Sequence, residues 1–320
     1  MQRKTKIWLV TAGLLVVVGL GLFAAVVWKQ GWDFTKLSTG EYETNTYEIS
    51  EDFDCLALYI DTADIVFLLS QDGKCKVECF EDVKAKHVAT VEEDTLRIQV
   101  IDERTLLDRI GIIYESPKIT VYLPQNQYNA LLVQGSTGNV TVPQAFSFDT
   151  VSIAVDTGTV SFCASASGQV NVKTSTGAIR VENSFAEILD LSVSTGMVTV
   201  SKVTCLGDMN VRVSTGKAVL TEVTCKNLIS NGSTGDITLD QVIAAEAFTI
   251  ERSTGDVIFK NSDALSISVI TDTGDVTGSL LTGKDFKVET DTGSISVPKE
   301  VTGGLCQITT DTGNIKITIP

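Results

Sequence analysis

Apolar residues alternate with polar ones on both sides of a Thr-Gly pair that recurs through residues 131–320. Counted from the glycine, the positions seven and five residues before it and two and four after it are apolar in nearly every copy. The positions between them are mostly polar. A period of two predicts a strand that enters a turn at the glycine and a strand that leaves it, each with one side facing a core.

The Thr-Gly pair occurs ten times at a spacing of 19 or 20 residues, with glycines at Gly138, Gly158, Gly177, Gly196, Gly216, Gly235, Gly255, Gly274, Gly293 and Gly313. A unit this short cannot bury its apolar side alone, but stacked units cover one another. The sequence therefore predicts an all-β fold, a single-stranded parallel β-helix (β-solenoid) of about ten coils. We expect right-handed winding, because parallel crossovers favour that hand.

The segment before the repeats, residues 45–130, predicts irregular coils of the same kind. The stretch "LYIDTADIVFL" resembles a worn copy of the repeated corner, with Ala63 in the place of the glycine. The stretch "IDERTLLDRIGIIYE" (residues 101–115) interrupts the strand pattern and is interpreted as a cap over an open coil end. We expect one continuous domain from residue 45 to residue 320, in which residues 131–320 are the regular repeats.

An uncharged run of 22 residues, Ile7 to Trp28, precedes this domain. As a helix it would be roughly 33 Å long, enough to cross the hydrocarbon core of a membrane. The basic residues of segment 1–6 come before it, which predicts a cytoplasmic N-terminus. The run is longer than the apolar region of a signal peptide, so an uncleaved anchor (7–28) and a linker (29–44) are favoured over a cleaved leader.

Charge narrows the choice of partners. From Lys29 onwards the chain holds all 40 acidic residues and 22 of the 25 basic ones, a net charge of −18. Such a surface disfavours nucleic acid and anionic lipid as partners. The chain has one histidine, His87, which excludes most histidine-based metal sites and makes a histidine-dependent catalytic triad depend on a single position. We interpret His87 as a surface or packing residue.

Asp291-Thr292-Gly293-Ser294 matches the local signature of aspartic proteases. Those enzymes need two such loops facing each other, so that two carboxylates share one proton. Stacked copies of a corner point the same way, and Ser replaces Asp in most copies. Both residues can accept a turn N–H through a side-chain oxygen. We therefore predict a structural corner here and no catalytic or cofactor-binding residues.

Acidic residues gather in the last corners. Asp272, Asp291 and Asp311 should stack in consecutive coils, with Asp236, Asp256 and Asp275 just after the glycines. Like charges at strand spacing repel, so either solvent screens them or a cation such as Ca²⁺ bridges some of them. Asp272, Asp291 and Asp311 are thus weak candidates for metal binding, and Ca²⁺ is the one cofactor that remains open.

The seven cysteines are an odd number for a complete disulfide framework; they are Cys55, Cys75, Cys79, Cys163, Cys205, Cys225 and Cys306. Cys205 and Cys225 are 20 residues apart and should be neighbours in adjacent coils, where they can form a disulfide or remain thiols. Buried thiols are favoured, because a free cysteine packs like a small apolar residue.

Several segments together resemble one bacterial family, the "putative adhesin" proteins or domain of unknown function 4097. They are the N-terminal membrane segment, the stretches "FDCLALYIDTADIVF" and "ITVYLP", and the series of (S/D)TGxI corners. The resemblance implies a β-solenoid on the outer face of the bacterial cell envelope, and it supplies no established catalytic residues to carry over to this sequence.

Three hypotheses for the function follow. The first is a non-enzymatic, single-pass membrane protein whose extracytoplasmic solenoid binds a cell-envelope polymer or a membrane protein partner in an adhesin-like way. The second is an accessory or sensor component of an envelope-stress signalling system. The third is a polysaccharide-acting β-helix enzyme, which should show a local break in the repeat.

Overall fold

The computed structural model describes residues 3–29, 31–32, 41–106, 108, 116–299 and 302–319. Residues 107 and 109–115 of the predicted cap, residues 30 and 33–40 of the predicted linker, and residues 1–2 of the basic end lie outside this description. The described chain consists of a single apolar helix followed by strands, which make up 71% of the structure.

The helix is α1 (Arg3–Lys29), and the strands are β1 (Tyr42–Ile49), β2 (Cys55–Thr62), β3 (Asp64–Leu69), β4 (Cys75–Asp82), β5 (Ala85–Glu92), β6 (Thr95–Asp102), β7 (Lys118–Leu123), β8 (Gln127–Thr137), β9 (Val140–Val142), β10 (Ser147–Phe162), β11 (Ser165–Ala166), β12 (Gln169–Glu182), β13 (Phe185–Ala186), β14 (Ile188–Cys205), β15 (Asp208–Thr234), β16 (Ile237–Thr254), β17 (Val257–Thr273), β18 (Val276–Leu280), β19 (Lys284–Thr292), β20 (Ile295–Ser296), β21 (Gly304–Thr312) and β22 (Ile315–Thr318).

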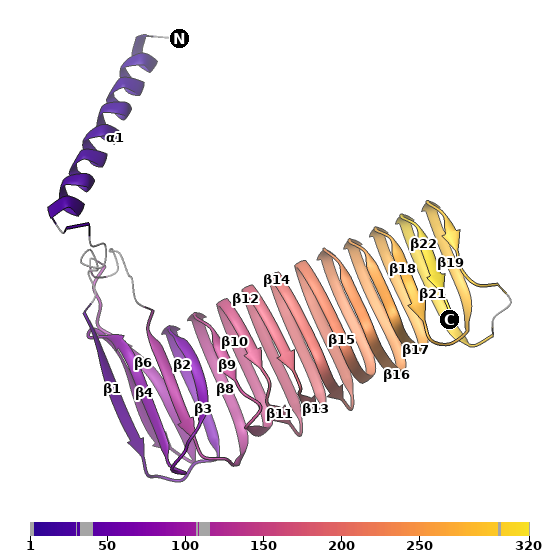
Figure 1. The fold of residues 1–320 in the computed structure, drawn as a ribbon, viewed down its shortest axis with the longest axis horizontal. Helices are drawn as coiled ribbons and strands as arrows, with labels where there is room; N and C mark the ends of the chain where they lie inside the picture. The colour runs from indigo at the N-terminus through magenta and orange to yellow at the C-terminus, as the bar shows by residue number, and fades with distance from the viewer. Residues whose placement is uncertain are drawn as a thin grey trace.

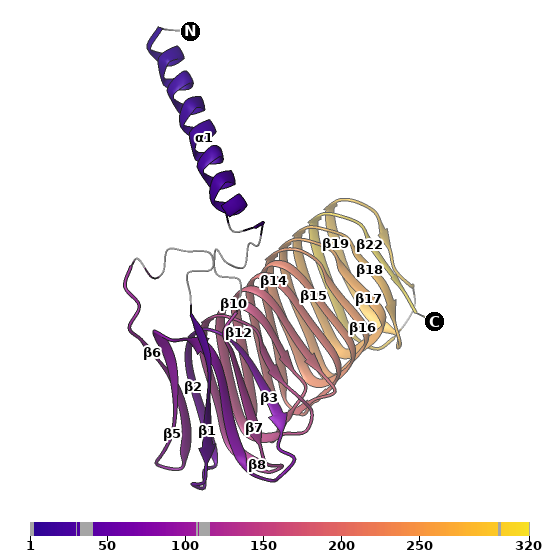
Figure 2. The same cartoon turned by 60° about the vertical axis from the view of Figure 1, so that its left-hand side comes forward.

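The strands stack in parallel into a rod of about nine turns, so the predicted β-solenoid is confirmed (Figures 1 and 2). Equivalent positions of successive coils pair with each other; between β12 and β14, for example, Val172 pairs with Leu191 and Gly177 with Gly196. The apolar columns of all coils form one continuous buried core along the rod. Each coil is thus covered by its neighbours, as a repeat too short for its own core requires.

Each coil has two faces that meet at the Thr-Gly corner. We call the strands before the glycine the entering face and the strands after it the leaving face. A second corner follows six residues after the glycine, at Asn183, Lys202, Glu222, Gln241 and Asn261, all with φ between 48° and 54°. The sequence does not predict this corner, because its residues are of four different types and only one of them, Asn, commonly adopts positive φ.

Glycine is required at this position of each repeat by the short distance between coils as well as by the geometry of the turn. The repeat glycines have φ between 124° and 159°. A Cβ placed on Gly196 would lie 1.7 Å from the carbonyl oxygen of Gly177 in the preceding coil. Ala63 takes the corresponding place in the N-terminal coil, as predicted, and the Cβ position of Gly138 faces its carbonyl oxygen. Each glycine therefore allows the next coil to approach at strand spacing.

The C-terminal coils do not stack in chain order. Strand β21 lies between β17 and β19, and β22 lies between β18 and β20. The last segment of the chain therefore does not close the rod, although stacking in chain order would place it at the end; the outermost coil is formed by β19 and β20 (Figure 1). Gly303 and Gly304 make the insertion sterically possible, since a Cβ on either would lie within 1.8 Å of a backbone oxygen, that of Gly283 or of Leu265.

The N-terminal coils are also out of chain order. Strand β2 lies between β6 and β8, and β3 lies beside β7 and β9, all in parallel. Beyond them, β4 pairs antiparallel with β7 and β1, while β5 pairs antiparallel with β6. The strands β1, β4, β5 and β6 therefore form an antiparallel cap at this end of the rod (Figure 2).

Candidate functional site

A buried carboxylate interrupts the apolar side of β4. Alternate residues of this strand face the core, and the series runs Cys75, Val77, Cys79, Glu81. The side chain of Glu81 is fully buried, at 0% exposure. A carboxylate in such a place needs hydrogen-bond donors or a cation, because its transfer from water costs several kcal/mol, on the order of the penalty for any buried ion.

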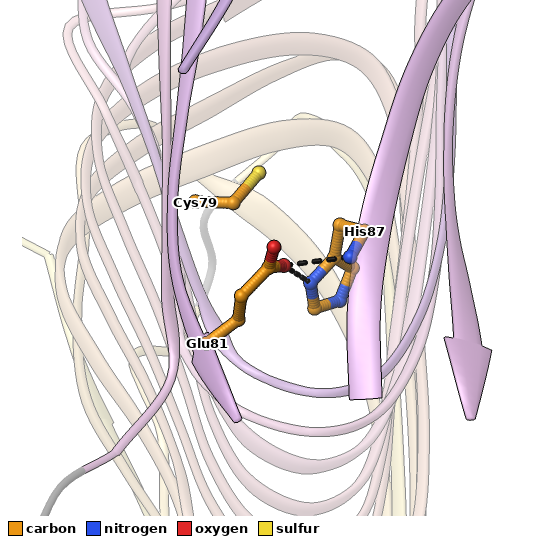
Figure 3. A group of neighbouring side chains, drawn as sticks. All are labelled: Cys79, Glu81 and His87. Atoms are coloured by element: carbon orange, nitrogen blue, oxygen red, sulfur yellow. Dashed lines mark hydrogen bonds and ion pairs between the residues drawn. The ribbon is translucent and has the colours of Figure 1, made fainter. Parts of the chain in front are cut away.

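The partner of Glu81 comes from the opposite face of the cap. Although β4 and β5 are joined by a tight turn, they pair only at Asp82 and Ala85, because β4 continues on the leaving face and β5 on the entering face. Side chains of the two strands therefore point toward each other across the interior. His87 of β5 lies against Glu81 in this space, and Cys79 lies beside them (Figure 3).

Hydrogen bonds hold the carboxylate on three sides. Glu81 Oε2 accepts a bond from the backbone N–H of His87 at 2.6 Å and lies 2.7 Å from His87 Nδ1. Asn45 of β1 donates to Glu81 Oε1 at 2.8 Å, and the Tyr47 hydroxyl donates to the carbonyl of His87. Burial, and then the negative charge of Glu81, raises the pKa of Tyr47, which therefore stays a donor.

The cluster offers three side chains that could bind a metal ion, and none of them is an exposed nucleophile. Burial, with a smaller contribution from Glu81, raises the pKa of the Cys79 thiol to about 12, so the thiol is protonated at neutral pH. Cys79, Glu81 and His87 are 0%, 0% and 3% exposed. Their ligand atoms lie within 4.8 Å of one another, and in the described part of the chain no other group of three metal-ligating side chains converges in this way.

The predicted aspartate ladder is present, but in a different order. Asp311 lies between Asp272 and Asp291, because β21 is inserted between β17 and β19. All three side chains are exposed. The flanking aspartates have a structural role: Asp236 accepts the backbone N–H of Asp256, and Asp256 accepts that of Asp275. Binding of Ca²⁺ by Asp272, Asp291 and Asp311 stays a prediction.

The entering face carries a continuous polar surface along the rod. Its outward side chains include many hydroxyls and amides, with charged residues such as Lys173, Asp190 and Glu251 between them, and we call this surface the polar face. Its hydroxyl and amide residues include Gln134, Ser136, Asn171, Ser175, Ser192, Ser194, Asn210, Ser214, Asn231, Ser233, Ser253 and Ser268. Two shallow hollows lie on it. One is lined by residues of β2, β6, β8 and β10, and the other by residues of β15, β16 and β17.

Arg252 forms part of the second hollow and has no carboxylate partner among the residues that the structure describes. Its guanidinium donates to Ser230 Oγ at 2.8 Å and to the carbonyl of Glu251 at 3.0 Å. Burial lowers the pKa of Arg252 to about 10. Gly232 makes room for it, because a Cβ there would lie 2.6 Å from Arg252 Nη1. Arg252 is thus a buried cation within the core of the repeats that the sequence did not predict.

The family model described as Toastrack DUF4097 matches residues 53–217 and 195–320, which together cover most of the chain. The chain belongs to the Toastrack DUF4097 family. The predicted family membership is thereby confirmed. No curated protein matches the chain.

Three solved structures to which the chain is similar come from two Parabacteroides species. A "putative lipid binding protein" from Parabacteroides distasonis is 18% identical over 75% of this chain and 98% of its own, with a TM-score of 0.47. A "putative adhesin" from the same species is 14% identical over 76% and 98%, with a TM-score of 0.49. Another from Parabacteroides merdae is 10% identical over 88% and 98%, with a TM-score of 0.47.

In this Toastrack chain, all seven cysteines are free thiols, and five of them are buried. Cys205 and Cys225 lie in adjacent coils as expected, next to the paired Thr204 and Thr224, without a disulfide between them. The sequence signal for the Cys79–Glu81–His87 cluster was Glu81 itself, which occupies an apolar column of β4. Of the two interpretations of His87, surface residue or packing residue, the structure agrees with the second, because its side chain is 3% exposed and lies 2.7 Å from Glu81 Oε2.

Proposed function

We propose that this chain is a non-enzymatic, adhesin-like protein, anchored in the bacterial membrane by α1, whose polar face binds a cell-envelope polymer. The observation that carries the proposal is the recurrence of hydroxyl and amide side chains along one face of the rod, with a hollow in each half. Equivalent side chains on this face recur about every 4.8 Å, so an extended polymer can make the same contact repeatedly.

The chemistry of the face favours a hydroxyl-bearing polymer. Serine and asparagine side chains can donate and accept hydrogen bonds with sugar hydroxyls. Arg252 adds one buried cation at the second hollow, which suits an acidic group on the polymer, because a buried guanidinium without a carboxylate is incompletely compensated. The net charge of the domain disfavours polyanions of high charge density, so a polymer with sparse acidic groups is the better match.

A matched pair of variants tests the polar face. Ser233→Arg adds a bulky cation to the polar face beside the second hollow, whereas Thr238→Arg adds the same side chain to the leaving face of the same coil. We expect Ser233→Arg to weaken co-sedimentation of the full chain with insoluble cell-wall polysaccharide by at least about tenfold, on the scale of one lost contact region. Thr238→Arg should bind like the unmodified chain.

Equal binding by both variants, or binding by neither the variants nor the unmodified chain, would contradict the polar-face proposal. Co-purification of a membrane protein with the full chain, unaffected by Ser233→Arg, would instead support the accessory or sensor hypothesis. Cleavage of the polysaccharide by the unmodified chain would support the enzyme hypothesis.

The proposal that α1 is a membrane anchor is based on its exposed apolar side chains. Its apolar run Trp8–Lys29 has a mean hydropathy of 2.6, and Trp8 and Trp28 are 75% and 76% exposed. A bilayer would cover such a helix on all sides, and the basic residues before it favour a cytoplasmic N-terminus.

If the anchor is not cleaved, the protein isolated from membranes should retain Met1, as measured by intact mass. It should resist extraction at alkaline pH and require detergent. In spheroplasts, an external protease should digest residues 41–320. A mature protein that begins after α1, or one released by alkaline washing, would show that the helix is a leader or a peripheral segment.

A further inference from the structure

The interior of the cap contains three side chains that can bind a metal ion, and the packing of the cap strands does not require them. The rest of the core between the two faces is filled mainly by apolar side chains, which need no hydrogen bonds, although it also includes Arg252 and the Lys284–Asp263 ion pair. At the end of the rod the chain instead places a thiol, a carboxylate and an imidazole together, all nearly inaccessible to solvent. Apolar residues of similar size would fill this space at a lower desolvation cost.

The orientation of His87 strengthens this point. Its Nδ1 points toward Glu81 and the side of the ring where Cys79 lies (Figure 3). Its Nε2 is buried and has no hydrogen-bond partner among the described residues. Leaving Nε2 without a hydrogen bond is unfavourable. The orientation of the ring is therefore determined by the contacts of Nδ1.

We propose that Cys79, Glu81 and His87 bind one Zn²⁺ ion. The ligands would be Cys79 Sγ, the Glu81 carboxylate and His87 Nδ1, with the metal in place of the proton between Nδ1 and Glu81 Oε2. Thiolate, imidazole and carboxylate together suit zinc, whereas Ca²⁺ and Mg²⁺ take oxygen ligands. Both carboxylate oxygens can coordinate, which provides four donor atoms from three residues.

The surrounding residues fit the outer contacts of such a site. Asn45 holds Glu81 Oε1 from β1, and the Tyr47 hydroxyl holds the backbone of His87. Contacts of this kind orient metal ligands in proteins. The ion would tie β4 on the leaving face to β5 on the entering face, at the end of the rod where only one residue pair joins these strands. Its role would be to close the cap nearest to α1 in the sequence.

The first experiment measures metal in the full chain in detergent. The protein is unfolded with a chelator and a thiol reductant, then refolded with ZnCl₂, because a fully buried site loads during folding. We expect one Zn²⁺ per chain by elemental analysis and release of the thiol proton in weakly buffered solution. With Co²⁺ in place of Zn²⁺, a thiolate-to-cobalt charge-transfer band should appear in the near ultraviolet.

Variants locate the ion. His87→Gln and Cys79→Ser should each lower zinc affinity by at least about 100-fold, and Cys79→Ser should abolish the charge-transfer band. Cys225→Ser removes a buried thiol from the middle of the rod and should change neither measurement. Asn45→Ala should lower affinity by about 10-fold and keep the band, because Asn45 only positions the carboxylate.

Three results would overturn the proposal. The first is refolded chain, shown to be folded by circular dichroism, that carries no stoichiometric zinc. The second is zinc bound equally well by His87→Gln and Cys79→Ser, which would place it on exposed carboxylates. The third is preferential binding of another metal when Zn²⁺ competes at equal concentration. None of these readouts depends on polymer binding, so the zinc site and the polar face can fail separately.

Discussion

Replacement of Gly196 by alanine is expected to destabilise the rod severely. The added Cβ would lie 1.7 Å from the carbonyl oxygen and 2.8 Å from the carbonyl carbon of Gly177. These are backbone atoms of a neighbouring coil held in register on both sides, so no rotamer change relieves the clash. We expect Gly196→Ala to lower the free energy of unfolding by more than about 4 kcal/mol, a value that only severely destabilising substitutions reach.

A matched control separates the steric clash from the strain of positive φ. Gly73 also has positive φ, 73°, but nothing lies within 4 Å of its Cβ position. Gly73→Ala should therefore cost only the conformational strain of an L-residue, about 1–2 kcal/mol. Thermal and denaturant unfolding followed by circular dichroism compare the two variants. If Gly196→Ala were as stable as Gly73→Ala, close approach between coils would not explain the glycine column.

The strands and the solenoid were predictable because the same pattern of apolar and polar residues recurs in every repeat. Period-two alternation is a direct record of which side chains face inward, and ten aligned copies average out local exceptions such as Ser230. The glycine column was also evident, although its reason was only partly recognised. A turn needs positive φ in each coil by itself, whereas the structure adds the approach of the next coil.

The stacking order could not be predicted from the same columns. Val269, Val288 and Ile308 occupy one column, and each pairs equally well with either of the others in a parallel ladder. A repeat therefore fixes the register between coils but leaves their order open. Only Gly303 and Gly304 distinguish the inserted coil, and a glycine pair in a connecting segment is more often simply a turn.

The cap cluster was not predicted for a different reason. A tight turn between two strand-like segments normally predicts a hairpin within one sheet. In that arrangement Glu81 and His87 would be near neighbours on one sheet. The structure instead separates β4 and β5 onto the two faces, and this depends on pairing with β1, β6 and β7 from distant parts of the sequence. Local pattern carries no information about such pairing.

Because the C-terminal coil is inserted between two others, we expect a disulfide to form for one pair of introduced cysteines and not for another. Gln307 of β21 pairs with Ser268 of β17 on one side and with Lys287 of β19 on the other. Ser268 and Lys287 are therefore two strands apart, roughly 9.6 Å. A disulfide needs Cα atoms less than about 7 Å apart.

We expect Ser268→Cys with Gln307→Cys to form a disulfide nearly completely under mild oxidation, and Ser268→Cys with Lys287→Cys to form none. Peptide mapping by mass spectrometry identifies the bond, and the unmodified chain with its seven native thiols provides the baseline. Amide exchange gives an independent measurement, because β21 has a paired strand on both sides and β19 on only one. Stacking in chain order would reverse both results: the double variant Ser268→Cys with Lys287→Cys would cross-link, and the amides of β21 would exchange faster than those of β19.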